Sequence, residues 1–160
     1  MSKSRLFNRL PAIAAGSLLV VALPAFGGES FTGKVTDASD GDTIVVGSGG
    51  RVRVVQLAGI DAPELTQDFG DDARDFVKSM TKGKKVTVEI LETKSKTSLV
   101  ANVSVDGKDL AAALVEAGLA WSETGSNADL KTAQEKAKSG KQGLWASTNP
   151  TPPWDFRKNA

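Results

Sequence analysis

The stretch QLAGIDAPE at residues 56–64 reads as the end of a β-strand followed by a loop that carries two carboxylates. Earlier in the chain, DGDT at residues 40–43 forms a second acidic turn. Hard cations such as Ca²⁺ prefer oxygen ligands from carboxylates and backbone carbonyls. Asp42, Asp61 and Glu64 therefore form a candidate cation site, provided that the two turns meet at the ends of strands of one small sheet.

The composition excludes several classes of active site. The chain has 160 residues, enough for one ordinary domain, and it contains no cysteine, histidine or tyrosine. Disulfides, zinc sites built from cysteine or histidine, and Ser-His or Cys-His nucleophiles are therefore excluded. Any chemistry must use carboxylates, lysines, arginines or a metal ion bound through oxygen.

Residues 1–27 have the pattern of a secretory signal peptide. Basic residues at positions 3, 5 and 9 precede a short apolar run, and Ala25-Phe26-Gly27 offers the small residues of a cleavage site. We expect cleavage after Gly27, with Ala25 as the alternative and an uncleaved N-terminal anchor as the competing interpretation. The mature protein is then exported, to the periplasm or the extracellular medium, without membrane attachment.

The mature chain is slightly acidic. Removing the three basic residues of the signal from the 20 Lys and Arg leaves 17 against 19 Asp and Glu, a net charge of −2. Proteins that coat nucleic acid through phosphate contacts are usually basic. The charge therefore argues against a DNA-coating role and allows only a local basic patch.

The order of predicted elements is typical of a small β-barrel. Alternating and β-branched residues predict five strands, at residues 31–35, 43–46, 51–58, 86–91 and 99–105. Helical spacing and end signals predict three helices, at residues 68–82, 110–117 and 127–140. Five strands with a helix after the third are the pattern of the OB-fold, a Greek-key barrel. The sequence thus predicts an α+β, mainly β protein with a five-stranded OB-fold barrel and three helices.

This pattern divides the chain into three parts. They are a signal peptide at residues 1–27, a barrel domain at residues 28–147 and a Pro-rich tail without regular pattern at residues 148–160. Within the domain we expect Trp121 and Trp145 in the core. Trp154 belongs to the tail and would pin it onto the barrel. We expect a monomer.

The motifs resemble those of the thermonuclease (staphylococcal nuclease) family. The similarity comprises DGDT at 40–43, a hairpin, LAGIDAPE at 57–64, GLW at 143–145 and PPWD at 152–155. It covers about residues 30–157, and it implies the same OB-fold barrel.

The resemblance implies a Ca²⁺-dependent phosphodiesterase that acts on nucleic acid. It assigns Asp42, Asp61 and the backbone carbonyl of Ala62 as metal ligands. It assigns Glu64 as the general base, acting with a water that attacks the phosphodiester. Such a metal serves as Lewis acid and template, and a carboxylate suits the role of base.

The resemblance also predicts two arginines that neutralise charge on the phosphate, and both positions are altered. Gln56 and Ser98 stand where these arginines are expected. Arg51 and Arg53 lie an odd number of residues from position 56, so strand alternation predicts them on the other face, as solvated charges. Lys96 shares the parity of Ser98 if the strand is regular, and it is then the candidate substrate-binding cation; the competing interpretation is a solvated loop lysine.

Two functions from different classes remain open. Loss of an arginine that binds the phosphate lowers the rate by about 10²-fold or more. The tyrosines that the resemblance predicts against the nucleotide are replaced by Lys96, Thr124 and Ser126. We therefore expect weak nucleic-acid binding, and either an impaired or inactive nuclease or a non-catalytic OB-fold binding module. Gln56 and Ser98 discriminate between the two, because an active site needs cations at these positions.

Overall fold

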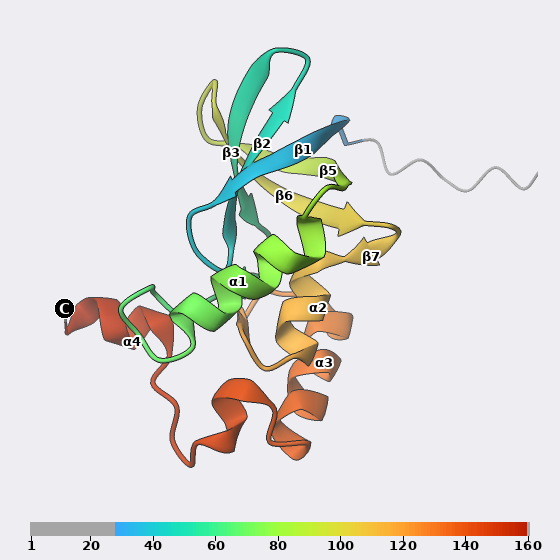
Figure 1. Cartoon of the computed structure of the whole chain (residues 1–160). Coiled ribbons are helices and arrows are strands. Elements are labelled where there is room, and N and C mark those ends of the chain that lie inside the picture. The colour runs from blue at the N-terminus through green and yellow to red at the C-terminus, as the bar shows by residue number, and fades with distance from the viewer. Residues whose placement is uncertain (1–27, 160) are drawn as a thin grey trace, which may run out of the picture.

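The computed structural model describes residues 28–159 and contains a closed β-barrel (Figure 1). The barrel strands are β1 (Ser30–Ala38), β2 (Thr43–Ser48), β3 (Arg51–Leu57), β5 (Lys85–Thr93) and β6 (Ser98–Val105). They neighbour one another in the order β3-β2-β1-β5-β6, and a parallel pairing of β3 with β6 closes the barrel. The predicted five-stranded OB-fold barrel is confirmed.

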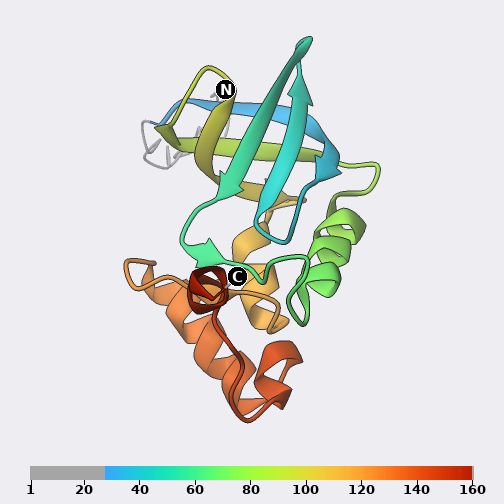
Figure 2. The same ribbon diagram turned by 90° about the vertical axis from the view of Figure 1, so that its left-hand side faces the viewer.

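Helices gather at one end of the barrel, as Figure 2 shows. They are α1 (Gly70–Thr81), α2 (Leu110–Glu116), α3 (Ala128–Ser139) and the short α4 (Pro153–Lys158), with a 3₁₀ turn at Gly143–Ala146. The side chains of Asp109 and Asn127 cap α2 and α3, each accepting a backbone N–H of the first turn. Three short strands, β4 (Ile60–Asp61), β7 (Lys108–Asp109) and β8 (Trp121–Ser122), complete the structure, and β4 pairs with β8.

The core fills the barrel and continues under the helices. Alternation along each strand sends every second side chain inward. The helix stripe predicted from sequence also faces the core: Ala73 and Val77 of α1 are fully buried, and Phe76 and Met80 pack against the same cluster. The largest fully buried side chains of the barrel and α2 are Ile44, Val46, Val55, Leu57, Val86, Val88, Val103, Val105, Leu110 and Leu114.

The tail differs from the prediction because it contains a helix. Residues 153–158 form α4, with Pro153 at its first helical position, where the fixed φ of proline suits a helix and no N–H is needed. A helix of six residues is too short to show a 3.6-residue period in sequence. Trp154 packs edge-to-face against Trp121 at 6.2 Å between ring centres, and so attaches the tail to β8.

The segment predicted as a signal peptide, residues 1–27, lies outside the described residues. Within residues 28–159, no helix combines the length and the apolar character that a membrane span requires.

Candidate functional site

The two acidic turns meet through one buried hydrogen bond. The backbone N–H of Ala62 donates to Asp42 Oδ2 at 2.8 Å, across twenty positions of sequence. Gly41 permits this approach, because a Cβ at position 41 would lie 2.6 Å from Ala73 Cβ and 2.8 Å from Ala62 Cβ. The loop between β4 and α1 is thereby fixed against the turn between β1 and β2.

Asp40 shapes the first turn. Its Oδ1 accepts the backbone N–H groups of Asp42, at 3.0 Å, and Thr43, at 2.7 Å. This arrangement is the ordinary way in which an aspartate closes a turn at the start of a strand. The Asp42 side chain is consequently directed toward Ala62.

Glu64 is held by the loop that precedes α1. The Glu64 carbonyl accepts the N–H of Gln67 at 2.8 Å, and its own N–H donates to Gln67 Oε1 at 3.3 Å. The Gln67 side chain also donates to the carbonyl of Thr151 in the tail. The Glu64 backbone is therefore fixed, and its side chain remains 37% exposed.

These residues line one polar cavity of about 260 Å³. The chain brings together the candidate ligands Asp42, Asp61 and Ala62, the candidate base Glu64, and Gln56 from the end of β3. The full lining consists of Asp40, Asp42, Thr43, Gln56, Asp61, Ala62, Pro63, Glu64, Glu123 and Arg157.

Asp42 is the buried carboxylate of this cavity, with only 9% of the residue exposed. Burial raises its pKa from the ordinary 3.8 to about 7; the hydrogen bond from Ala62 opposes the rise, and the charge of Asp40 adds to it. The Thr43 hydroxyl donates to Asp42 Oδ1 at 2.9 Å. The ionised form of Asp42 is therefore costly unless a cation lies nearby.

Arg157, from α4, reaches the same cavity and contacts two of its carboxylates. Its two terminal nitrogens bind both oxygens of Asp61, Nη1 to Oδ1 at 3.1 Å and Nη2 to Oδ2 at 2.8 Å. Nη1 also donates to Glu64 Oε1 at 2.8 Å. These two acids raise the pKa of Arg157 further, so it is always charged.

A second cation reaches the position where the resemblance predicts an arginine. The ammonium of Lys94 donates to Gln56 Oε1 at 2.8 Å. Ser98, at the second such position, starts β6 opposite Val54 of β3 and does not line the cavity. Lys94 therefore contacts the wall of the cavity, because Gln56 is part of the lining.

Lys96 does not reach the acidic cavity. It lines a separate groove of about 490 Å³ with Arg51, Val52, Arg53 and Thr97. Strand alternation does not extend to Lys96, because β6 begins only at Ser98 and residue 96 lies in the preceding turn. As expected, Arg51 is exposed; Arg53, in contrast, is partly covered and stacks over the ring of Phe31 at 4.3 Å.

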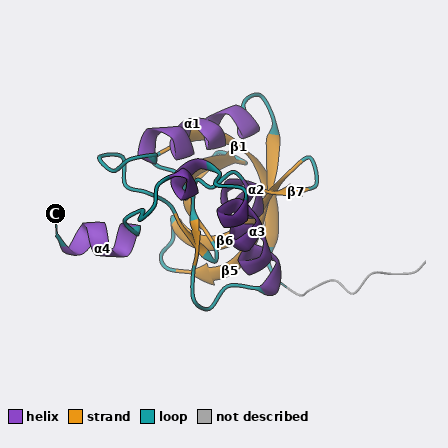
Figure 3. Cartoon of the chain, turned by 90° about the horizontal axis from the view of Figure 1, so that it is seen from below, coloured by secondary structure: helices purple, strands orange, loops and turns teal. Residues whose placement is uncertain are grey.

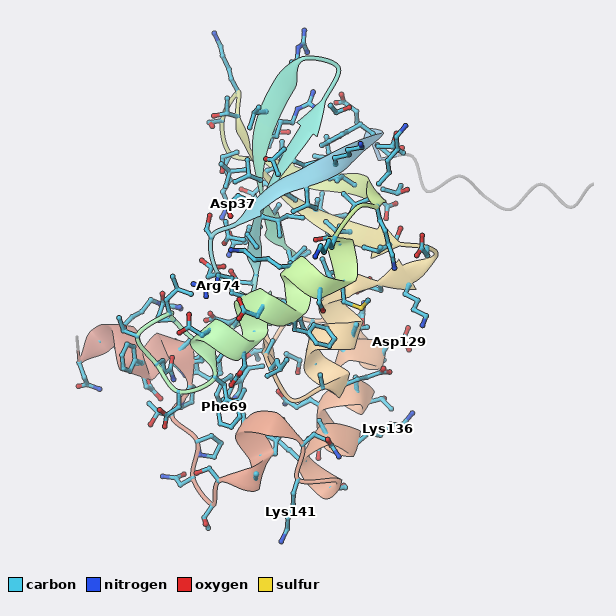
Figure 4. The ribbon with its side chains drawn as sticks, viewed as in Figure 1. Asp37, Phe69, Arg74, Asp129, Lys136 and Lys141 are labelled. Atoms are coloured by element: carbon cyan, nitrogen blue, oxygen red, sulfur yellow. The ribbon has the colours of Figure 1, made fainter. Side chains whose placement is uncertain are left out.

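Sequence reasoning missed three residues near the site: Lys94, Glu123 and Arg157. Lys94 and Glu123 lie in segments with no regular pattern, and Arg157 lies in the tail. The one available signal was the PPWD motif, which indicates an ordered segment that ends two residues before Arg157. Figure 4 shows that Lys136 and Lys141 lie on the helical part of the molecule, away from the barrel, so they do not supply the cavity with charge.

The donor set of the cavity fits a hard cation. Its lining offers five carboxylates and no soft ligand within the described residues, as Ca²⁺ and Mg²⁺ prefer. In the arrangement present among residues 28–159, however, no three carboxylates are grouped closely enough to hold one metal ion. Both oxygens of Asp42 accept hydrogen bonds from the protein, and both oxygens of Asp61 are bound by Arg157. Loading a cation therefore requires these contacts to rearrange.

Comparison with known proteins agrees with the fold and the motifs. The family model described as staphylococcal nuclease homologue matches residues 54–147. An "Uncharacterized endonuclease" of Escherichia coli O157:H7 is 37% identical over 128 residues, covering 78% of this chain and 84% of the relative.

Two further relatives carry nuclease names. A "Micrococcal nuclease" of Shigella flexneri is 31% identical over 162 residues, covering 93% of this chain and 92% of the relative. The "Staphylococcal-like nuclease CAN1" of Arabidopsis thaliana is 33% identical over 107 residues, covering 66% of this chain and 33% of the relative.

Proposed function

Since the chain belongs to the staphylococcal nuclease family, we propose that it is an exported phosphodiesterase that cleaves nucleic acid with the help of a divalent cation. One observation carries the proposal: Asp42, Asp61 and Glu64 come from two separate turns and line one polar cavity. Export is supported by the signal-peptide pattern of residues 1–27.

Asp42, Asp61 and the Ala62 carbonyl would hold the cation, and Ca²⁺ is the ion that the family resemblance implies. A divalent cation there supplies Lewis-acid polarisation of the phosphoryl oxygens and a template for the substrate. The Ala62 N–H keeps Asp42 directed into the cavity, and Asp40 keeps the turn closed.

Glu64 is the general base of the proposed reaction. A water beside it gives a proton to the carboxylate while the water oxygen forms a bond to phosphorus. The ester P–O bond breaks, and the leaving oxygen takes a proton from the solvent. The backbone contacts with Gln67 hold Glu64 at the cavity wall, and its partial exposure leaves room for the water.

The reaction is expected to be slow because the charge on the phosphate is poorly compensated. Lys94 brings one positive charge to Gln56, but an ammonium acts as a point charge and lacks the bidentate geometry of a guanidinium. Each missing guanidinium of this kind lowers the rate by about 10²-fold or more.

A non-catalytic OB-fold binding module is the second candidate. Gln56 and Ser98 favour it, and so do the contacts of Arg157, which cover Asp61 and Glu64. In this case the cavity would bind a ligand, or none, without cleaving it.

Digestion of end-labelled single-stranded DNA by the mature protein separates the two candidates. Wild type is compared with Glu64→Gln and with Glu116→Gln, an exposed glutamate of α2, in Ca²⁺ and in EGTA. The phosphodiesterase predicts Ca²⁺-dependent cleavage that Glu64→Gln loses and Glu116→Gln keeps. No digestion by any of the three proteins at high protein and low salt favours the binding module. Equal digestion by all three contradicts the assignment of Glu64 as the base.

A further inference from the structure

Helix α4 brings a charged group of the chain itself to the carboxylates that the proposed reaction requires. Arg157 binds Asp61 through both carboxylate oxygens and Glu64 through one. With the guanidinium bound to it, the Asp61 side chain is only 14% exposed. A cation held by Asp61 and a guanidinium bound to the same two oxygens exclude each other.

The attachment of α4 to the rest of the molecule is light. Of its residues only Pro153 is buried, and Trp154 is 37% exposed although it contacts Trp121. Figures 1 and 3 show α4 at the outer edge of the molecule, apart from the barrel and the other helices. Displacement of α4 would therefore remove few side chains from buried positions.

The tail that carries α4 also passes over a cavity of about 260 Å³. This second cavity is lined on one side by the loop before α1, including Gln67 and Phe69, and on the other by tail residues such as Pro150 and Phe156. Figure 4 places Phe69 near the start of α1, on the side of the tail. Imperfect packing beneath the segment lowers the cost of moving it.

We propose that Arg157 and a divalent cation compete for Asp61 and Glu64, so that α4 is a latch that closes the cavity until the cation displaces it. The proposal rests on the cation site of the proposed function. It assigns to the C-terminal helix control over loading of the site.

Electrostatic interactions favour either of two arrangements, with α4 bound to the carboxylates or released by a cation. The carboxylates of this cavity repel one another unless a positive charge compensates them. Arg157 supplies one such charge from within the chain, and a divalent cation supplies two. Because the cation and the guanidinium also repel each other, binding of the cation favours the released position of α4.

The test is calorimetric titration of Ca²⁺ into the mature wild type, Arg157→Gln and Lys158→Gln. Lys158 is the matched control, because it is the next residue of α4 and, among residues 28–159, pairs only with Asp155, at 3.0 Å. Arg157→Gln should bind Ca²⁺ about five-fold more tightly, the factor that corresponds to an ion pair of about 1 kcal/mol. Lys158→Gln should bind like wild type.

Tryptophan fluorescence reports the movement of α4 separately. Release of the latch separates Trp154 from Trp121, so Ca²⁺ should change the emission of wild type, and should change that of Arg157→Gln much less because the ion pair that Ca²⁺ displaces is absent there. An equal change in Arg157→Gln, or no change in wild type that binds Ca²⁺, overturns the latch.

The outcomes distinguish this inference from the proposed function. Tighter Ca²⁺ binding by Arg157→Gln without DNA cleavage by any variant supports the latch and contradicts the phosphodiesterase. Cleavage with unchanged or weaker Ca²⁺ binding by Arg157→Gln contradicts the latch and supports the phosphodiesterase. Absence of Ca²⁺ binding in all proteins contradicts both.

Discussion

Arg157 Nη2 lies 2.8 Å from Asp61 Oδ2, although the two residues are 96 positions apart in the chain. The contact joins the last helix to β4, the short strand that follows the barrel strand β3. Through this contact, a segment outside the barrel compensates the negative charge of the cavity. We therefore expect that a ligand of the cavity changes the free energy of unfolding of the whole protein.

Millimolar Ca²⁺ should raise the melting temperature of the mature protein, because the folded cavity binds the ion and the unfolded chain does not. At a Ca²⁺ concentration of 100 times the dissociation constant, the free energy of unfolding rises by about 2.7 kcal/mol. Differential scanning calorimetry in Ca²⁺ and in EGTA measures it, and Asp61→Asn should lose most of the gain. An unmoved melting curve for wild type would contradict the cation site.

Without divalent cations, stability should fall as the pH rises from 4 to 7. Burial raises the pKa of Asp42 to about 7, so in this window the folded protein holds a proton that the unfolded chain releases. Above pH 7, the raised pKa of Asp42 lowers the free energy of unfolding by at most about 4 kcal/mol, at 1.36 kcal/mol per pKa unit.

Asp42→Asn removes this charge and should be more stable than wild type at pH 8 but nearly equal to it at pH 4. Urea unfolding in EGTA at both pH values measures the difference. Asp72→Asn, which changes an exposed aspartate of α1, serves as the control. A difference between Asp42→Asn and wild type that is the same at both pH values would contradict the assignment.

Gly41→Ala should destabilise the protein and separate the two acidic turns. The added Cβ would lie 2.6 Å from Ala73 Cβ and 2.8 Å from Ala62 Cβ, and overpacking of this kind costs about 1–3 kcal/mol. Gly125→Ala is the control, since open space surrounds a Cβ at that position. Equal unfolding midpoints in urea for the two variants would show that the contact at Gly41 is not tight.

Lys94→Gln should slow cleavage of single-stranded DNA more than Lys96→Gln does. Lys94 contacts Gln56 at the cavity wall, whereas Lys96 lies in the separate groove. Loss of a charge near the phosphate should reduce the rate by about tenfold, less than the loss of a bidentate clamp. Initial rates at saturating Ca²⁺ compare the two, and a larger loss in Lys96→Gln would reverse the assignment.

The sequence predicted those parts of the molecule that depend on local pattern. Alternation and turn residues located the five barrel strands, and the spacing of Ala73, Phe76, Val77 and Met80 located α1. The two acidic turns could be placed at strand ends, and Gln56 could be identified from its position before the loop.

Long-range contacts of flexible side chains could not be predicted. Lys94 and Arg157 reach the site from a turn and from the tail, and no periodicity relates either residue to Gln56 or Asp61. Lys96 was assigned by strand parity, which requires a regular strand, and the turn before Ser98 breaks that parity. Helix α4 is stabilised by the contact with Trp121, which its own six residues do not reveal.

If Asp42, Asp61 and Glu64 form the proposed hydrolytic site, a guanidinium restored at position 56 should raise its rate. The most direct test is the initial rate of single-stranded DNA cleavage, with Ca²⁺, by Gln56→Arg compared with wild type. We predict a rate about 10²-fold higher, and loss of that gain when Glu64→Gln is added to the same chain. A rate equal to that of wild type, or a gain that survives Glu64→Gln, would contradict the catalytic role of these three acids.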